Sequence, residues 1–276
     1  EEHGGCVIST TINKYVVSTL NPTIGKTTII NCKEEETKLV RAVLKRLKQH
    51  GNVSIKSDIL PHSGLGNSAS ATVSLLGLFV DKPKNEIAEL AYSIEKNDLK
   101  NKGGKQDQYA ATFGGLNFIE FRGGKNVKVT PLKIKREKEL EKNLLLVNVG
   151  KRTNSGDIIK TYNYTVEFLN KTKRITLKMK RELENGNLKM FGKLLGEAWE
   201  TKKLFTPYMT NNFLDSIYET ATNNGALGGK VMGAGGGGHM LFYCENKNGV
   251  IKALRKYNVK FVNFKFEKKG LQVKKL

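Results

Sequence analysis

The feature that most constrains this chain is the segment 228–238, in which seven of the eleven residues are glycine. Glycine in regular structure costs roughly 0.5–1 kcal/mol relative to alanine, because it loses more backbone freedom on folding. A segment this rich in glycine therefore needs a compensating interaction. It contains no serine-rich spacer and leads into strand-like residues 239–244, which argues against a flexible linker. We expect its backbone to approach a ligand or another loop closely.

A second glycine turn, PHSGLGNSAS at residues 61–70, lies between a predicted strand and a predicted helix of small residues. Its glycines allow close backbone approach, and the unpaired N–H groups and dipole of the following helix attract phosphate. No Lys-Ser or Lys-Thr follows the glycines, so this is not a Walker loop. A dinucleotide site is also disfavoured, because Glu86 falls inside a predicted helix and not at a strand end. The alternative is a tight turn in which Asn67 or Ser68 only caps the helix.

Two carboxylates lie twelve residues apart between these glycine segments. Glu95 ends a predicted amphipathic helix, and Asp107 follows Gly103 and Gly104 in what we predict to be a shaped loop. Taken singly, Glu95 is typical of a solvated helix residue and Asp107 of a cap. Near phosphates, however, one carboxylate can hold Mg²⁺ and another can accept a hydroxyl proton. The three cysteines and four histidines show no zinc spacing, so a metal would be bound by oxygen.

In this order, these segments resemble the GHMP small-molecule kinases. GLGNSAS at residues 64–70 resembles the second motif of the family, G-L-G-S-S-A, and KVMGAGGG at residues 230–237 resembles the third. GGKQDQYAATFGGLNF at residues 103–118 is similar to the sugar-kinase branch of the family that includes kinases of heptose 7-phosphate, and the similarity covers essentially the whole chain. Asn67 stands where the family has serine, a change that we expect the turn to tolerate.

The resemblance implies a role for each segment. Ser68 and Glu95 would hold Mg²⁺, and Asp107 would be the catalytic base or the orienting carboxylate for the acceptor hydroxyl. The substrate would contact Gly104, Lys105, Asp107 and Arg152, although a surface cation is the alternative for Arg152. The ATP phosphates would be bound by the two glycine-rich loops, at Pro61, Gly64, Leu65, Gly66, Asn67, Ser68, Ala69, Gly233, Ala234, Gly235, Gly236 and Gly237.

The implied activity is that of an ATP- and Mg²⁺-dependent kinase acting on a hydroxyl of a sugar or sugar phosphate, with D-glycero-D-manno-heptose 7-phosphate as the expected acceptor. Galactose, fucose, homoserine and mevalonate are alternative acceptors. The net charge of +21, from 47 Lys+Arg and 26 Asp+Glu, raises a different class, a non-catalytic RNA-binding protein. The lysines are spread along the whole chain, which favours a solvated basic surface that attracts small phosphorylated substrates. The sequence does not determine the oligomeric state, and a homodimer is one possibility.

The order of predicted elements favours an α+β fold with two lobes, because strands concentrate early and helices dominate residues 151–224. We predict strands over 7–20 and 259–266 and a helix over 34–50, and we assign no helix or strand to the glycine-rich segment 225–238. The ATP-binding lobe would span 1–150 and the second lobe 151–276. The resemblance implies a mixed α/β first lobe and a ferredoxin-like α+β second lobe.

No apolar run approaches the roughly 20 residues of a membrane span, and no secretory signal is visible, so we expect a cytoplasmic protein. The first motif of the family, an Arg-containing strand with a glycine run and Thr-Asp, would precede Glu1. Either this sequence is a piece of a longer protein, truncated at the start of its first lobe, or the protein has lost sugar binding. We expect the first, because the phosphate, metal and base positions all remain.

Overall fold

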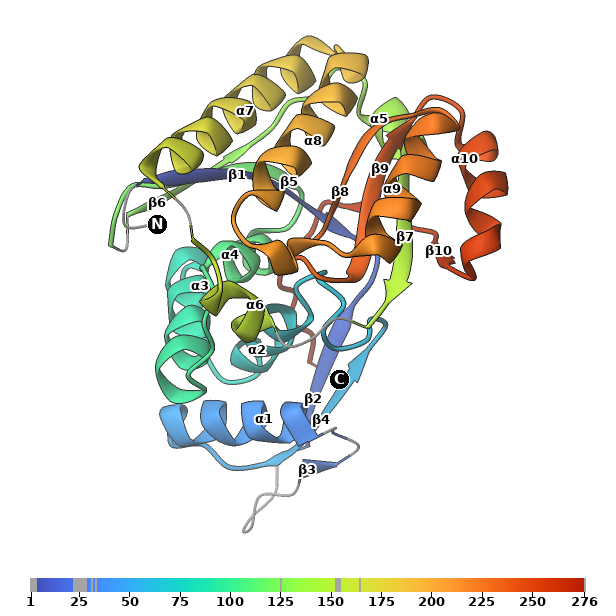
Figure 1. Cartoon of the computed structure of the whole chain (residues 1–276). Coiled ribbons are helices and arrows are strands. Elements are labelled where there is room, and N and C mark those ends of the chain that lie inside the picture. Colours follow the sequence, from blue (N-terminus) through green and yellow to red (C-terminus); the bar gives the residue numbers. More distant parts are fainter. Residues whose placement is uncertain are drawn as a thin grey trace.

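The computed structural model describes residues 4–21, 29, 30, 32, 34–124, 126–151, 155–163 and 165–275. Helices and strands alternate irregularly along the chain (Figure 1), which confirms the predicted α+β class. In chain order the elements are β1 (Gly5–Ile12), β2 (Val16–Asn21), β3 (Ile29–Ile30), α1 (Glu34–Leu47), β4 (Asn52–Ser57), α2 (Asn67–Gly77), α3 (Lys84–Ser93), the π-helical turn η1 (Ile94–Asp98), α4 (Gln106–Phe113), β5 (Leu116–Phe121), β6 (Val127–Pro131), α5 (Glu137–Asn143), β7 (Leu144–Gly150), α6 (Ser155–Lys160), α7 (Val166–Asn185), α8 (Leu188–Lys203), η2 (Pro207–Met209), α9 (Asn212–Asn223), β8 (Ala226–Val231), β9 (Gly238–Cys244), α10 (Lys247–Leu254), η3 (Arg255–Tyr257), β10 (Lys260–Val262) and β11 (Phe266–Glu267).

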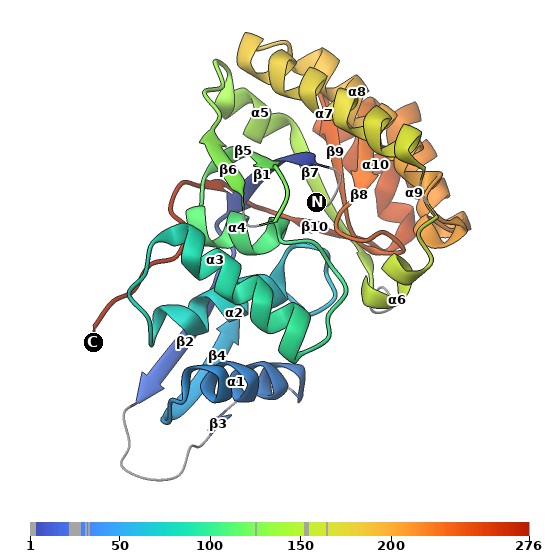
Figure 2. The ribbon, with the colours of Figure 1, turned by 90° about the vertical axis from the view of Figure 1, so that its left-hand side faces the viewer.

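The described strands form three sheets. The β1–β5 sheet has the order β11-β1-β5-β6 and is antiparallel throughout. The β2–β4 sheet has the order β2-β4-β3, with β3 parallel to β4. The β7–β9 sheet has the order β10-β7-β9-β8 and is antiparallel. Figure 2 shows α2, α3 and α4 lying together between α1 and the β1–β5 sheet.

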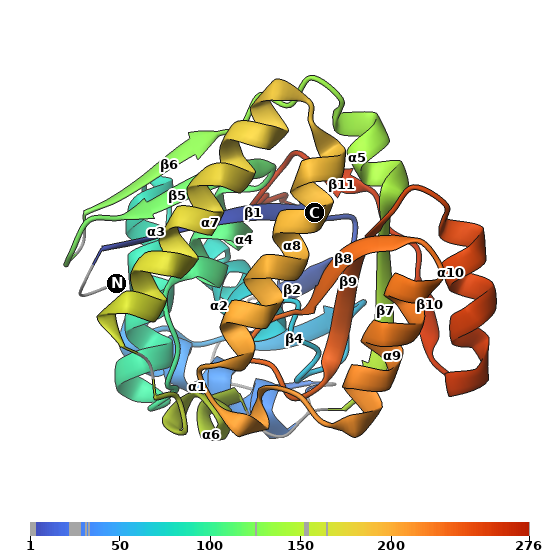
Figure 3. The same cartoon turned by 45° about the horizontal axis from the view of Figure 1, so that its top comes forward.

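The sheets are supported by hydrophobic clusters, of which two are large cores. Around β4, helix α1 buries Leu39, Val40, Val43 and Leu44 at helical spacing, which confirms the helix predicted over 34–50. The second core lies between the β7–β9 sheet and the helices α8, α9 and α10, with Trp199 fully buried at its centre. Helix α7 lies across β1 (Figure 3), so that apolar residues of both sheet systems pack together there.

The strands predicted over 7–20 and 259–266 were each wrong in one respect, because each is two strands in different sheets. β1 and β11 pair with each other, whereas β2 and β10 belong to the other two sheets. The chain changes sheet at Asn13 and Lys265, which face each other. The Asn13 N–H donates to the Lys265 carbonyl at 3.0 Å, and the Asn13 side chain accepts from the Lys265 N–H at 2.8 Å. Alternation along the sequence indicates a strand but not the sheet to which it belongs.

The glycine-rich segment 225–238 was assigned no strand, yet residues 226–231 form strand β8. A Cβ atom on Gly228 would lie 2.2 Å from the Gly192 carbonyl oxygen of α8. A Cβ atom on Gly229 would lie 2.3 Å from the Phe242 ring on β9. These two glycines therefore let a helix and an aromatic ring lie directly against the strand.

We predicted two lobes with a boundary near residue 150. Residues on each side of this boundary pair with residues on the other side. Strand β7, which ends at Gly150, pairs with β9 and β10 from the second half of the chain. The C-terminal segment returns to the first half, where the Leu271 N–H donates to the Thr112 carbonyl at the end of α4. The boundary itself stays a prediction. Within the residues that the structure describes, no helix is long and apolar enough to cross a membrane.

Candidate phosphoryl-transfer site

The glycine turn before α2 adopts the conformation that only glycine accommodates readily. Gly64 and Gly66 have φ angles of 81° and 71°, and α2 begins at the next residue. Gly66 is the N-cap, and no side chain caps the helix. Asn67, expected as a possible cap, instead accepts a hydrogen bond from the Ser57 hydroxyl at 2.6 Å. The first-turn N–H groups of α2 therefore lie at the turn without a capping side chain.

Glu95 lies at the centre of a buried hydrogen-bond network beside this turn. Its side chain is 7% exposed and sits in the π-helical turn η1 that follows α3. One carboxylate oxygen accepts from the Ser68 hydroxyl at 2.9 Å. The other accepts from the Thr72 hydroxyl at 3.1 Å and from the Gln108 side-chain amide at 3.0 Å. These bonds fix Glu95 against the start of α2.

Asp107 approaches the same turn from α4. The residue is exposed, and a Cβ atom on Gly66 would lie 3.6 Å from its Cγ. Asp107 occupies the first turn of α4 and not the loop that was predicted around it. Its neighbour Gln108 is buried and donates to Glu95. Helix α4 therefore carries one of the two carboxylates, Asp107, and holds the other, Glu95, through Gln108. Residues 66–68, 95 and 107, which are far apart in sequence, thus meet in space.

The glycine loop before β9 packs against the turn of residues 61–70 and against the second half of the chain. A Cβ atom on Gly238 would lie 2.5 Å from the Ser63 carbonyl oxygen. The Gly236 N–H donates to the Met209 carbonyl at 2.9 Å. The Tyr162 hydroxyl donates to the Ala234 carbonyl at 2.7 Å, and the Lys202 ammonium donates to the Gly233 carbonyl. These contacts offset the entropy lost when so many glycines are ordered.

The two remaining predicted substrate residues that can be described have different environments. Gly104 is exposed just before α4. Lys105 is only 4% exposed, and its ammonium group lies 2.8 Å from Glu89 and donates to the Gly124 carbonyl at 2.7 Å. This geometry favours a structural role for Lys105, which holds the start of α4 against α3. Arg152 lies outside the described residues.

Sequence reasoning missed two residues that position Glu95. Thr72 lies one helical turn after Ser68 on α2, so both hydroxyls face the same side of the helix. The (i, i+4) spacing was a readable signal. Gln108 carried no such signal, because its amide reaches Glu95 only through the packing of α4 on α2.

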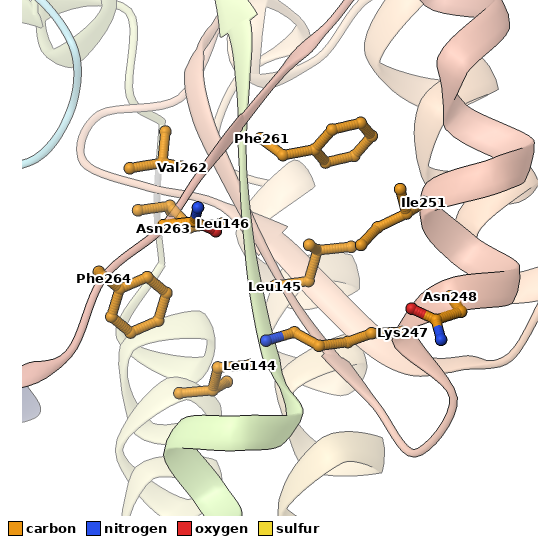
Figure 4. Close-up of a pocket in the computed structure, with 10 residues that line it drawn as sticks. All are labelled: Leu144, Leu145, Leu146, Lys247, Asn248, Ile251, Phe261, Val262, Asn263 and Phe264. Atoms are coloured by element: carbon orange, nitrogen blue, oxygen red, sulfur yellow. The ribbon is translucent and has the colours of Figure 1, made fainter.

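The pocket drawn in Figure 4 lies away from these residues. It has a volume of about 360 Å³ and is formed by β7, α10 and residues 261–264. Lys247 extends toward it among apolar side chains, and burial lowers the pKa of this lysine. Neither carboxylate of the site lines this pocket, so pocket size does not identify the chemistry of the chain.

The comparisons with known proteins agree with this geometry. Residues 37–115 match the GHMP kinases N terminal domain, and residues 179–263 match the GHMP kinases C terminal domain. A D-glycero-alpha-D-manno-heptose 7-phosphate kinase of Campylobacter jejuni is 38% identical over 231 residues, which cover 78% of this chain and 68% of that protein. The chain belongs to the GHMP kinase family. These matches confirm the predicted family, the enzyme class and the two-lobed fold of this GHMP kinase. They favour a kinase over the alternative of a non-catalytic RNA-binding protein.

Solved structures extend the similarity of this GHMP kinase to the whole fold. A D-glycero-D-manno-heptose 1-phosphate kinase from Bacteroides thetaiotaomicron superposes with a TM-score of 0.79 and 30% identity, covering 99% of this chain and 92% of that one. A mevalonate kinase of L. major, solved with R-mevalonate, superposes with a TM-score of 0.76 at 19% identity, covering 98% of this chain and 93% of that one. At that identity the likeness shows the fold alone.

Proposed function

We propose that this GHMP kinase transfers the γ-phosphoryl group of ATP to a hydroxyl group of a heptose phosphate. The observation that carries the proposal is the meeting of the glycine turn, the Ser68–Glu95 pair and Asp107 around one point. The acceptor class is supported by the two heptose phosphate kinases that share 38% and 30% identity with this chain. Mevalonate and galactose remain acceptors of relatives that are similar mainly in fold.

The nucleotide phosphates would lie against the start of α2. The uncapped N–H groups there can donate to phosphate oxygens, and the helix dipole favours negative charge at this end. Gly64 and Gly66 leave no side chain between the backbone and the ligand. The loop 233–237 would support the turn from the other side. The net charge of +21 would draw anionic substrates toward the protein.

The residues at Ser68 and Glu95 fit a magnesium ion. Their donor atoms are a hydroxyl oxygen and a carboxylate oxygen, the hard ligands that Mg²⁺ prefers. The Gln108 side-chain oxygen is buried beside them and has no hydrogen-bond partner in the described part of the chain. No group of three histidine, cysteine, aspartate or glutamate side chains that could hold a metal occurs among those residues. Ser68 and Glu95 would therefore hold Mg²⁺ together with phosphate oxygens, and the bound ion would neutralise charge on the phosphates.

Asp107 would accept the proton of the acceptor hydroxyl. As the hydroxyl oxygen bonds the γ-phosphorus, the bond from that phosphorus to the β–γ bridging oxygen breaks, ADP leaves and the proton passes to Asp107. The exposed position of Asp107 next to Gly66 would bring its carboxylate to the end of the phosphate chain. Most of the rate enhancement would then come from positioning and charge neutralisation.

The experiment compares Asp107→Asn with the parent protein and with Asp81→Asn, an exposed aspartate outside the site. ADP release is measured by a coupled assay with heptose 7-phosphate, galactose, fucose, homoserine and mevalonate as acceptors. A positioned base contributes about 10²–10⁴-fold, so we expect Asp107→Asn to lose at least about 100-fold in kcat with ATP affinity nearly unchanged. Parent-like turnover of Asp107→Asn would show that the assigned base is wrong. Preference for a non-phosphorylated acceptor would show that the acceptor class is wrong.

A further inference from the structure

His239 links the glycine loop before β9 to the glycine turn before α2. It is the second residue of β9 and follows the four glycines 235–238. The ring is 4% exposed, and its Nδ1 lies 2.8 Å from the Ser63 carbonyl oxygen. A carbonyl oxygen can only accept a hydrogen bond, so Nδ1 carries the proton and donates it to Ser63.

The other side of the ring is fixed by Asn148 of β7. The Asn148 side-chain nitrogen lies 3.3 Å from Nε2 of His239. The Asn148 side-chain oxygen accepts from the Gly150 N–H at 2.9 Å, which turns the NH₂ group toward the ring. Nε2 then accepts while Nδ1 donates, so the chain of bonds from Gly150 through Asn148 and His239 to Ser63 selects the neutral Nδ1–H tautomer.

Side-chain hydrogen bonds hold the two ends of this turn, from His62 to Glu35 and from Asn67 and Ser68 to Ser57 and Glu95, so the His239 bond acts on the residues between them. Gly64 and Gly66 have positive φ angles and no side chains to pack. The Ser63 hydroxyl is buried without a hydrogen-bond partner among the described residues, so Ser63 is held through its carbonyl group. Gly238 contributes direct backbone contact at the same place, because a Cβ atom there would overlap the Ser63 carbonyl. At the other end of the loop, the Met232 N–H donates to the His239 carbonyl at 2.8 Å.

We propose that His239 is a positioning residue that sets the geometry of the turn 63–68 for nucleotide phosphate through its hydrogen bond to the Ser63 carbonyl. This inference rests on the proposed function, since it assigns the ATP phosphates to that turn. His239 acts from β9, so the β7–β9 sheet controls a phosphate site carried by α2. Its effect falls on ATP binding and not on the proton transfer at Asp107.

A matched pair of variants tests the bond. Asparagine places a side-chain N–H close to the position of Nδ1, whereas leucine has the same branched shape without a donor. We expect His239→Leu to raise KM and Kd for ATP about tenfold, with kcat at saturating ATP within about twofold of the parent. We expect His239→Asn to stay within about threefold of the parent in all three quantities. The Kd is measured by calorimetry without acceptor, and thermal unfolding of each variant is recorded alongside.

The outcomes separate the inference from the proposed function. Equal ATP affinities for the leucine and asparagine variants, or a loss confined to kcat, would overturn the inference while leaving the kinase assignment intact. A parent protein that does not bind ATP would overturn the proposed function and the inference with it. Should the leucine variant not fold, ¹⁵N NMR of histidine-labelled parent decides, with His239→Asn used to assign the signal. A protonated Nδ1 with an unprotonated Nε2 supports the bond, and the opposite tautomer excludes it.

Discussion

Replacing Glu95 with glutamine should separate the charge of this side chain from its hydrogen bonds. Ser68 donates to one carboxylate oxygen, while Thr72 and Gln108 donate to the other. In Glu95→Gln the carbonyl oxygen must face Gln108, whose amide nitrogen can only donate. The new NH₂ group then faces Ser68, whose hydroxyl oxygen can accept. Each bond keeps a donor and an acceptor, so we expect a change of less than about 1 kcal/mol in the free energy of unfolding.

The activity of Glu95→Gln should fall much further, because the proposed magnesium ligand loses its negative charge. Removing one group that stabilises the charge of a transition state typically costs about 10²–10³-fold in kcat, or 2.7–4 kcal/mol. We expect a loss of at least about 100-fold in kcat/KM and a higher Mg²⁺ concentration at half-maximal rate. The assay follows ADP release at a series of Mg²⁺ concentrations, with chemical denaturation measured in parallel. Glu86→Gln, an exposed glutamate of α3, is the control.

Two results would refute this reasoning. Parent-like turnover and Mg²⁺ dependence would mean that Glu95 does not hold the ion. A large loss of stability with glutamine would mean that the network cannot rearrange in the way described. Glu95→Leu provides the contrast, because it leaves the Gln108 amide donor buried without its acceptor, at a cost of about 1–3 kcal/mol.

Three further predictions concern buried residues. Lys105→Met should lower the free energy of unfolding by about 3–5 kcal/mol, because the Glu89 carboxylate loses its cation partner at a site where the two side chains are 5% and 18% exposed and keeps the hydrogen bond from the Tyr109 hydroxyl. A change below about 1 kcal/mol in urea denaturation would contradict the structural role of Lys105. Gly228→Ala should cost about 3 kcal/mol through overpacking against the Gly192 carbonyl, and unchanged stability would mean that α8 lies further from β8. Burial raises the pKa of the Cys244 thiol to about 12 from 9.0, so this thiol should resist alkylation at pH 8 until the protein unfolds, as read by mass spectrometry. Because the pKa of Cys244 is higher in the folded state, its contribution to the free energy of unfolding is complete below pH 9 and is lost between pH 9 and 12. Rapid alkylation of the native protein would argue against the burial of this thiol.

Local chemistry made much of the site predictable. Gly64 and Gly66 were placed in a turn before a small-residue helix, and both adopt the positive φ angles that such a turn requires. Ser68 and Glu95 were paired through the family resemblance and lie in hydrogen-bond contact. Asp107 was expected in a loop because two glycines precede it, yet α4 begins just before it.

The contacts of the polar side chains depend on packing between distant elements. Lys105 follows the same two glycines and was predicted to contact substrate, but Glu89 and Gly124 surround its ammonium group. His239 follows a glycine run without any pattern that relates it to Ser63, 176 residues away. A hydrogen bond of this separation is set by how the sheets are stacked, which the periodicity of a single segment does not encode.

The sequence by itself determined which segments of this protein could come close to a ligand, because glycine at 64, 66, 233 and 235–238 is a property of the chain and limits what each segment can do. It also determined the helix that follows Gly66 and the strand that follows Gly238, but not strand β8 before Gly233. Only the tertiary structure decided which side chains meet. The packing of α4 on α2 directs Gln108 to Glu95, and the approach of β9 to the turn of residues 61–70 directs His239 to Ser63, because these contacts join groups that are close only after the chain has folded.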